Sequence, residues 1–410
     1  MNVRRSAAAL AAAGVLAAAS PALAASPSPS PSTVLPSGLY GDTDPTYDGV
    51  WRQSLALLAQ HTVSVTPAAK AVDWLTGQQC ANGAFAAFRA EPARACDAKV
   101  MVDSNSTAAA VQALSALGGH EDATGKAVTW LKSVQNEDGG WGYAPGGASD
   151  ANSTGVVIGA LAAAGERPAE VTKGGRSPYD ALLKLALPCT GEGAGAFAYQ
   201  PDKKGVLTAN ADATAAAVVG TLGAGFDAKP GESGNSSNGS GTGCAASDPL
   251  TPEQAAANGA GYLAKAVAAD GHLTSALAGA PEQPDYGNTA DAVVALAAQG
   301  GADRAAKPLA WLEQNAAAWA KQSGPAAYAQ LVFAAHATGT DPRDFGGTDL
   351  VRALNATGPA PQPAKTAETA EKAAKDDGGP GTNVWWMVGT GLAAGAGIGF
   401  LLSSRRKQQL

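Results

Sequence analysis

The stretch Asp103-Ser-Asn-Ser-Thr-Ala-Ala-Ala-Val-Gln-Ala-Leu-Ser-Ala-Leu-Gly118 decides the fold, because the chain repeats it. A polar cap, a run of Ala, Val and Leu, and a final glycine are typical of a helix of about 14 residues. Further copies run from Asp150 to Gly165, from Asn210 to near Gly225, and from Asp285 to Gly300. Asp48–Gln60 is a first copy, and Pro325–Gly339 is a divergent copy without the cap.

A second kind of apolar segment alternates with the first and carries an aromatic-Leu pair near its middle. Its copies are Trp74-Leu75, Trp130-Leu131, Tyr262-Leu263, Trp311-Leu312 and a weaker one at Tyr179–Leu183. A helical hairpin repeated about every 50 residues must stack on its neighbours to bury its apolar face. We therefore expect an all-α domain over residues 47–355, built from six hairpins. Periodicity alone allows a closed ring or an open solenoid.

One turn between the two kinds of segment resembles a known repeat. Trp130-Leu-Lys-Ser-Val-Gln135-Asn-Glu-Asp138-Gly139-Gly140-Trp141-Gly142 is similar to the Gln–Trp repeat of squalene–hopene cyclases, and the run from Trp74 to Phe85 is a weaker copy. This resemblance to prenyltransferase/squalene oxidase repeat proteins implies an α6/α6 toroid. Triterpene cyclases, prenyltransferase β subunits, thioester domains and cobalamin carriers share that fold, so function depends on the site.

The catalytic motifs of these families are incomplete in this chain. Class II terpene cyclases use the central acid of Asp-x-Asp-Asp-Thr-Ala, and the nearest match here is Asn210-Ala-Asp212-Ala-Thr214-Ala215. Asn210 and Ala213 stand where flanking acids would poise Asp212 as a strong acid. Aromatic residues are also scarce, at 6% of the chain. The sequence therefore leans against an enzyme, with Asp212 as the catalytic residue of the alternative.

Two other chemistries of the fold also lack their residues. Prenyltransferase zinc needs Asp, Cys and His ligands, and the four His residues here are widely separated. The thioester motif Gly-Cys-Gly-Glu-Gln is absent from the sequence. We expect no metal site and no catalytic cofactor.

The non-catalytic branch of the fold implies a ligand at one mouth of the ring. Cobalamin carriers hold a large polar ligand there, so cobalamin is the ligand that this resemblance suggests. Inner-helix starts would converge at that mouth, and ordinary helix caps explain the same residues structurally. The candidate ligand-binding residues are Asp103, Asn105, Asp150, Asn152, Asp212, Asp285 and Asn288, with Trp141 and Tyr143 from the Gly-rich turn.

The two ends of the chain indicate export and membrane anchoring. Residues 1–24 have the order of a signal peptide: Arg4-Arg5, an apolar run, and a cleavage site at Ala22-Leu23-Ala24. Val384–Leu402 carries no charge and precedes the basic tail 403–410, as a single membrane span with a cytoplasmic C-terminus would. A Ser/Pro-rich linker, 25–46, and a Pro/Ala/charged linker, 356–383, flank the domain.

The cysteines also fit an extracytoplasmic location. Disulfides persist in oxidising compartments, and no Cys-x-x-Cys pair suggests zinc. Four cysteines allow three pairings. Chain order favours Cys80 with Cys96 and Cys189 with Cys244, since each bond would close one long loop.

Composition narrows the partners. A formal net charge of −7 argues against nucleic acid. Our prediction is a non-catalytic surface protein that binds a small polar, corrinoid-like ligand or docks a partner at the membrane. Two alternatives stay open: a degenerate terpene-cyclase-like enzyme using Asp212, and a structural or adhesive spacer.

Overall fold

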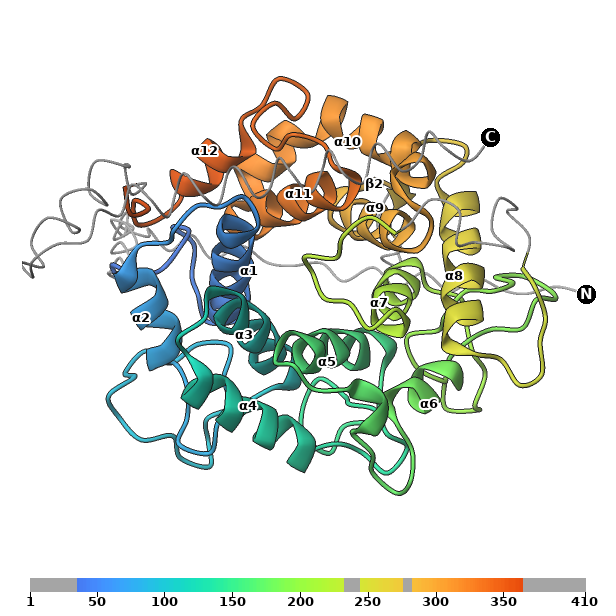
Figure 1. Ribbon diagram of the computed structural model, residues 1–410, viewed down its shortest axis with the longest axis horizontal. Coiled ribbons are helices and arrows are strands. Elements are labelled where there is room, and N and C mark those ends of the chain that lie inside the picture. Colours follow the sequence, from blue (N-terminus) through green and yellow to red (C-terminus); the bar gives the residue numbers. More distant parts are fainter. Residues whose placement is uncertain (1–34, 232–243, 276–281, 364–410) are drawn as a thin grey trace, which may run out of the picture.

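The regular secondary structure of the protein is almost wholly helical in a computed structural model, which describes residues 35–231, 244–275 and 282–363 (Figure 1). These residues form twelve α-helices and one short 3₁₀ helix, η1 (Pro168–Glu170). The strands β1 (Leu273–Thr274) and β2 (Pro284–Asp285) pair antiparallel, with Leu273 opposite Asp285. The prediction of a helical domain is confirmed, and this two-residue ribbon is a strand pairing that the sequence did not reveal.

Six of the helices form an inner ring (Figure 1). They are α1 (Gly49–Thr62), α3 (Ser104–Leu117), α5 (Ala151–Ala163), α7 (Ala211–Thr221), α9 (Tyr286–Gly300) and α11 (Pro325–Thr338). Each packs against the next, and α11 packs against α1, so the contacts close on themselves. An open solenoid has no such contact between its first and last repeats.

The other six helices lie outside this ring, each packed on the inner helix of its own hairpin (Figure 1). They are α2 (Ala69–Gly77), α4 (Glu121–Ser133), α6 (Pro178–Leu183), α8 (Pro252–Ala266), α10 (Ala302–Ser323) and α12 (Leu350–Asn355). The two predicted kinds of segment therefore correspond to the inner and the outer helices. Helix α7 ends at Thr221, earlier than the predicted end near Gly225.

A threonine in the first turn of four inner helices ties each helix to the turn before it. The Oγ1 atom of Thr107 accepts a hydrogen bond from the backbone N–H of Phe85 at 2.9 Å. Thr154 accepts from the N–H of Trp141 at 3.1 Å in the same way. The corresponding pairs in the next two repeats are Thr214 with Phe197 and Thr289 with Leu273. The repeated Thr is thus a buried connector as well as a helix-start residue.

Glycine lets these turns reach the next repeat. Gly83 has a φ of 95°, and a Cβ there would lie 2.2 Å from the carbonyl oxygen of Lys126 in α4. Gly139 has a φ of 90°, and its Cβ would lie 2.2 Å from the carbonyl oxygen of Ser177, which caps α6. Any side chain would separate the turn of one repeat from the outer helix of the next.

Both predicted disulfides are present. Cys80 bonds to Cys96 and closes the loop after α2. Cys189 bonds to Cys244 and joins the loop after α6 to the segment before α8, with α7 between the two cysteines. The predicted signal peptide, 1–24, and membrane span, 384–402, lie outside the described residues. Within the described residues, no helix is both long and apolar enough to cross a membrane.

Helices α5 and α7 of the inner ring approach each other closely. A Cβ on Gly155 would lie 2.6 Å from the backbone oxygen of Ala216, and one on Gly220 would lie 2.8 Å from the Cα of Gly155. Gly155→Ala must therefore push the two helices apart. We expect it to lower the free energy of unfolding by about 1–3 kcal/mol, measured by denaturant titration.

Gly125→Ala is the matched control for this substitution. Gly125 lies in the exposed part of α4, and a Cβ there would meet nothing within 4 Å. The control should stabilise the protein by about 0.5–1 kcal/mol, because alanine orders a helix better than glycine. Equal effects of the two substitutions would contradict the close α5–α7 contact.

Candidate functional site

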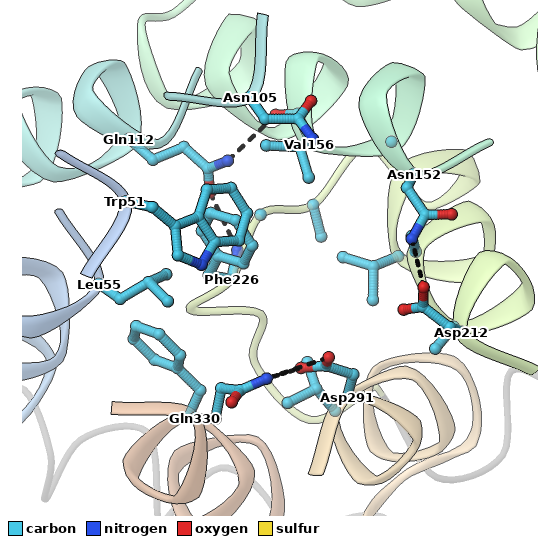
Figure 2. Close-up of a pocket in the computed structure, with 18 residues that line it drawn as sticks. Trp51, Leu55, Asn105, Gln112, Asn152, Val156, Asp212, Phe226, Asp291 and Gln330 are labelled. Carbon is cyan, nitrogen blue, oxygen red and sulfur yellow. Dashed lines mark hydrogen bonds between the residues drawn. The ribbon is translucent and has the colours of Figure 1, made fainter. Parts of the chain in front are cut away.

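A cavity of about 210 Å³ lies inside the ring of inner helices (Figure 2). All six inner helices contribute to its wall, together with the loop that follows α7. Polar side chains gather near the first turns of α3, α5 and α7, and apolar side chains surround the rest. The site is therefore a chamber shared by the whole ring.

One side of the cavity is formed by a carboxylate and an amide from neighbouring helices. Asn152 of α5 donates from Nδ2 to the Oδ2 atom of Asp212 in α7 at 2.7 Å (Figure 2). Burial raises the pKa of Asp212, the hydrogen bond from Asn152 opposes that rise, and the negative charge of Asp285 adds to it. Asp212 thus lies in the cavity wall with a single amide partner.

A second carboxylate, Asp291 of α9, lies one turn further into the ring. It accepts from Nε2 of Gln330 in α11 at 3.2 and 3.3 Å, which are long hydrogen bonds (Figure 2). Burial raises its pKa to about 7, and the charges of Asp212 and Asp285 add to the rise. Near neutral pH this group can therefore either hold or release a proton.

The loop after α7 closes the opposite end of the cavity with an aromatic side chain. The ring of Phe226 stacks on Phe333 of α11 with centroids 6.2 Å apart, and meets Trp51 of α1 edge-on at 5.4 Å. Gln112 of α3 accepts from the backbone N–H of Phe226 at 3.0 Å and donates to the carbonyl oxygen of Val156 at 3.1 Å. Phe226 therefore forms a fixed apolar floor.

Glycines let this loop enter the ring. A Cβ on Gly159 of α5 would lie 2.8 Å from the Cα of Gly225, and one on Gly225 would lie 2.3 Å from Oε1 of Gln112. The backbone of the loop therefore touches both α3 and α5 directly. Further along, the N–H of Gly231 donates to the carbonyl oxygen of Ala297 in α9 at 2.9 Å, so the loop spans the ring.

The structure separates the predicted ligand-binding residues into two groups. Asn105, Asn152 and Asp212 line the cavity. Asp103, Asp150 and Asp285 cap their own helices by accepting from Ser106, Ser153 and Asn288. Asn288 also donates to Asp285 at 2.8 Å. Cap residues and cavity residues thus stand two positions apart in the repeats that begin with α3, α5 and α7.

The two aromatic candidates lie away from the cavity wall. Trp141 is fully buried, and its indole N–H donates to the carbonyl oxygen of Leu131 at 2.8 Å. Tyr143 is 49% exposed beside the start of α3, where its carbonyl oxygen accepts from the N–H of Ser104. Burial raises the pKa of Tyr143, and the charge of Asp103 adds to that rise.

Sequence reasoning missed several residues of the cavity. Asp291, Gln330 and Gln112 each lie inside an inner helix, whereas the predicted site residues lie at helix starts or in the Gly-rich turn. A lone polar side chain in an Ala- and Val-rich inner helix was the available signal. Phe226 gave no comparable signal, because its place depends on a loop that enters the ring.

Within the described ranges, no group of three or more His, Cys, Asp or Glu residues is arranged to hold a metal ion.

Comparisons with known proteins give structural neighbours only. No family model and no curated protein matches the sequence. Among solved structures, the ent-copalyl diphosphate synthase from Streptomyces platensis aligns at 17% identity with a TM-score of 0.45, over 71% of this chain and 50% of the synthase. A protein from Actinoplanes aligns at 16% identity with a TM-score of 0.32, over 70% of this chain and all of that one. The chain thus spans half the length of the synthase.

The raised pKa of Asp291 predicts a pH-dependent stability. A carboxyl group with a folded-state pKa near 7 contributes stability below about pH 4, and this contribution is lost as the pH rises to 7. Asp291→Asn removes the charge, so it should stabilise the protein at pH 8 by at most about 4 kcal/mol and change little at pH 4. Urea titrations at both pH values measure the difference.

Asp303→Asn is the control, because Asp303 is an exposed carboxylate in the first turn of α10. It should show no such gain at pH 8. A pH-independent effect of Asp291→Asn would contradict the assigned protonation.

Because Phe226 forms the floor of the cavity, removing its ring should let a longer ligand fit. Phe226→Ala should deepen the cavity, so that 4-phenyl-1-butanol binds at least roughly tenfold more tightly than it does to the wild type. Phe88→Ala is the control, since Phe88 stacks on Trp74 outside the cavity. Calorimetric titration measures both, and a gain in the Phe88 variant alone would contradict this assignment.

Proposed function

We propose that this chain is a binding protein of the α6/α6 toroid class, which holds a small molecule in the cavity inside its ring. The main support for this proposal is the cavity itself, whose wall includes residues of all six inner helices. The cavity is polar on one side and is closed by Phe226 on the other. Small-molecule sites are concave and mostly apolar, with a few placed polar groups. The closed order of helix contacts supports the assignment to this class.

The volume favours a ligand smaller than a corrinoid. Pockets for drug-sized ligands have volumes of about 300–1,000 Å³. The cavity here has about 210 Å³, and a corrinoid is larger than a drug-sized ligand. We therefore narrow the expected ligand to a compact molecule with one polar end, and cobalamin becomes the less favoured candidate.

The location proposed for this binding protein is the outer face of the cell membrane. The two disulfides fit an oxidising compartment. The signal-peptide pattern of 1–24 and the apolar run of 384–402 supply the export and the anchor. The sequence also predicts that the protein docks a partner or acts as a structural spacer. No feature of the cavity requires either role.

Native mass spectrometry of the full-length chain from its own cells tests the binding function. We expect a small adduct on the wild type and none on Val156→Trp, whose larger side chain would fill the cavity. Val206→Trp is the control, because Val206 is 54% exposed on a loop. An adduct retained by Val156→Trp would place the ligand elsewhere. A wild type without adduct, unchanged in melting temperature by small amines and alcohols, would overturn the function.

Acid–base catalysis is a second candidate, favoured by the pKa of about 7 at Asp291. A carboxyl group that titrates near neutral pH can donate a proton to a bound substrate. Asp212, the acid of the cyclase alternative, lies in the same cavity wall. Conversion of squalene or a polyprenyl diphosphate, abolished by Asp212→Asn and Asp291→Asn, would support it. Product from both variants would contradict it.

A further inference from the structure

The charges that face the cavity are all negative. Asp212 and Asp291 are its only charged lining residues, and no lysine, arginine or histidine is among the side chains that form its wall in the described part of the chain. Arg52 of α1 instead pairs with Asp48 at 3.2 Å. Both carboxylates are partly buried, and a carboxylate withdrawn from water without a positive partner is costly, so a ligand cation would reduce that cost.

The other titratable groups near Asp212 and Asp291 do not neutralise the negative charge of these two carboxylates. The negative charge of Asp285 adds to the raised pKa of both carboxyl groups. The pKa of the Tyr199 hydroxyl is raised by burial, then by Asp150 and, to a smaller extent, by Asp212. The cavity-lining residues of α3, α5 and α11 are uncharged. His336 lies outside the cavity lining, and burial lowers its pKa. On the loop after α7, Asp227 opposes that decrease and Lys229 adds to it.

Several hydrogen-bond acceptors of the wall lack a full set of donors from the described residues. Among these residues, Asp291 accepts side-chain hydrogen bonds only from Gln330, at long distances, and Asp212 only from Asn152. The buried amide oxygens of Asn105 and Asn152 accept no hydrogen bond within the described residues. Buried polar atoms are normally paired, so this shortage of donors indicates that a ligand supplies them.

Aromatic and aliphatic side chains form the remaining wall. Trp51, Phe226 and Phe333 pack against one another at the floor, and Leu55 and Val294 extend the apolar surface. An apolar group suits this part of the chamber. A charged group fits only beside the carboxylates.

We propose that the ligand of this cavity is a primary ammonium ion carrying a compact apolar or aromatic group. The inference rests on the proposed binding function and adds the class of ligand. An ammonium group brings three N–H donors and one positive charge, and both Asp212 and Asp291 line the cavity that would hold it. The apolar group then lies against Phe226 and Trp51.

The pH dependence follows from this arrangement. Below about pH 7, Asp291 holds a proton that the cation must displace, whereas an alkylammonium ion keeps its charge up to about pH 10. The affinity should therefore rise as the pH is raised from 5 to 8.

The test is calorimetric titration of the full-length chain with 2-phenylethylammonium, and with 2-phenylethanol as its neutral analogue. We expect the ammonium ion to bind at least roughly tenfold more tightly at pH 8 than at pH 5, with no such change for the alcohol. Asp291→Asn and Asp212→Asn should each weaken the ammonium ion by roughly tenfold and spare the alcohol. Asp303→Asn, the exposed control, should change neither.

Two further probes sharpen the result. Trimethyl(2-phenylethyl)ammonium keeps the charge without N–H donors, so it should bind more weakly than the primary ion. Equal affinity for ammonium ion and alcohol, or an ammonium affinity indifferent to both Asp substitutions, would overturn the ligand class and leave a neutral-ligand pocket. Binding of neither probe would also overturn it. The adduct measurement with Val156→Trp decides the binding function separately.

Discussion

A hydrogen bond from the backbone N–H of a buried turn residue to the threonine of the following inner helix is the interaction on which the ring depends. It fixes where each helix begins relative to the turn before it, as Thr154 does for Trp141. The adjacent glycine then lets that turn touch the next outer helix. The first repeat has no threonine here, and Oε1 of Gln53 accepts instead from the N–H of Tyr40 at 2.9 Å. Register and spacing therefore pass from one repeat to the next until α11 meets α1.

This register also determines where the functional side chains lie. In the Asp-x-Asn-Ser-Thr segments, the first residue caps the helix, the third faces the cavity and the fifth binds the turn, as Asp150, Asn152 and Thr154 show. Each of these positions lies two residues from the next, which is a little over half a turn of an α-helix. One short motif thus supplies both the helix caps and the side chains of the cavity wall. For this reason the sequence alone could not distinguish residues that cap a helix from residues that face the cavity.

The helices could be predicted because their causes are local. Caps and terminal glycines are set by neighbouring residues, and all eleven segments named from the sequence are helices in the described residues, with α12 as the addition. The disulfide pairing followed from chain order alone, although Cys189 and Cys244 are 55 residues apart. The cavity could not be predicted as fully, because Asp291, Gln330 and Phe226 meet across the ring. Their proximity depends on how six repeats close, and the periodicity alone left that closure open.

The two cavity carboxylates are best explained together. Each raises the cost of charging the other, so the empty chamber is more stable when Asp291 holds a proton. A bound cation reverses this balance, because its attraction favours the charged carboxylates and releases that proton. Ligand binding and proton release are then linked through one residue. Such a link distinguishes an ammonium site from a neutral pocket of the same shape, since only the former couples its affinity to pH.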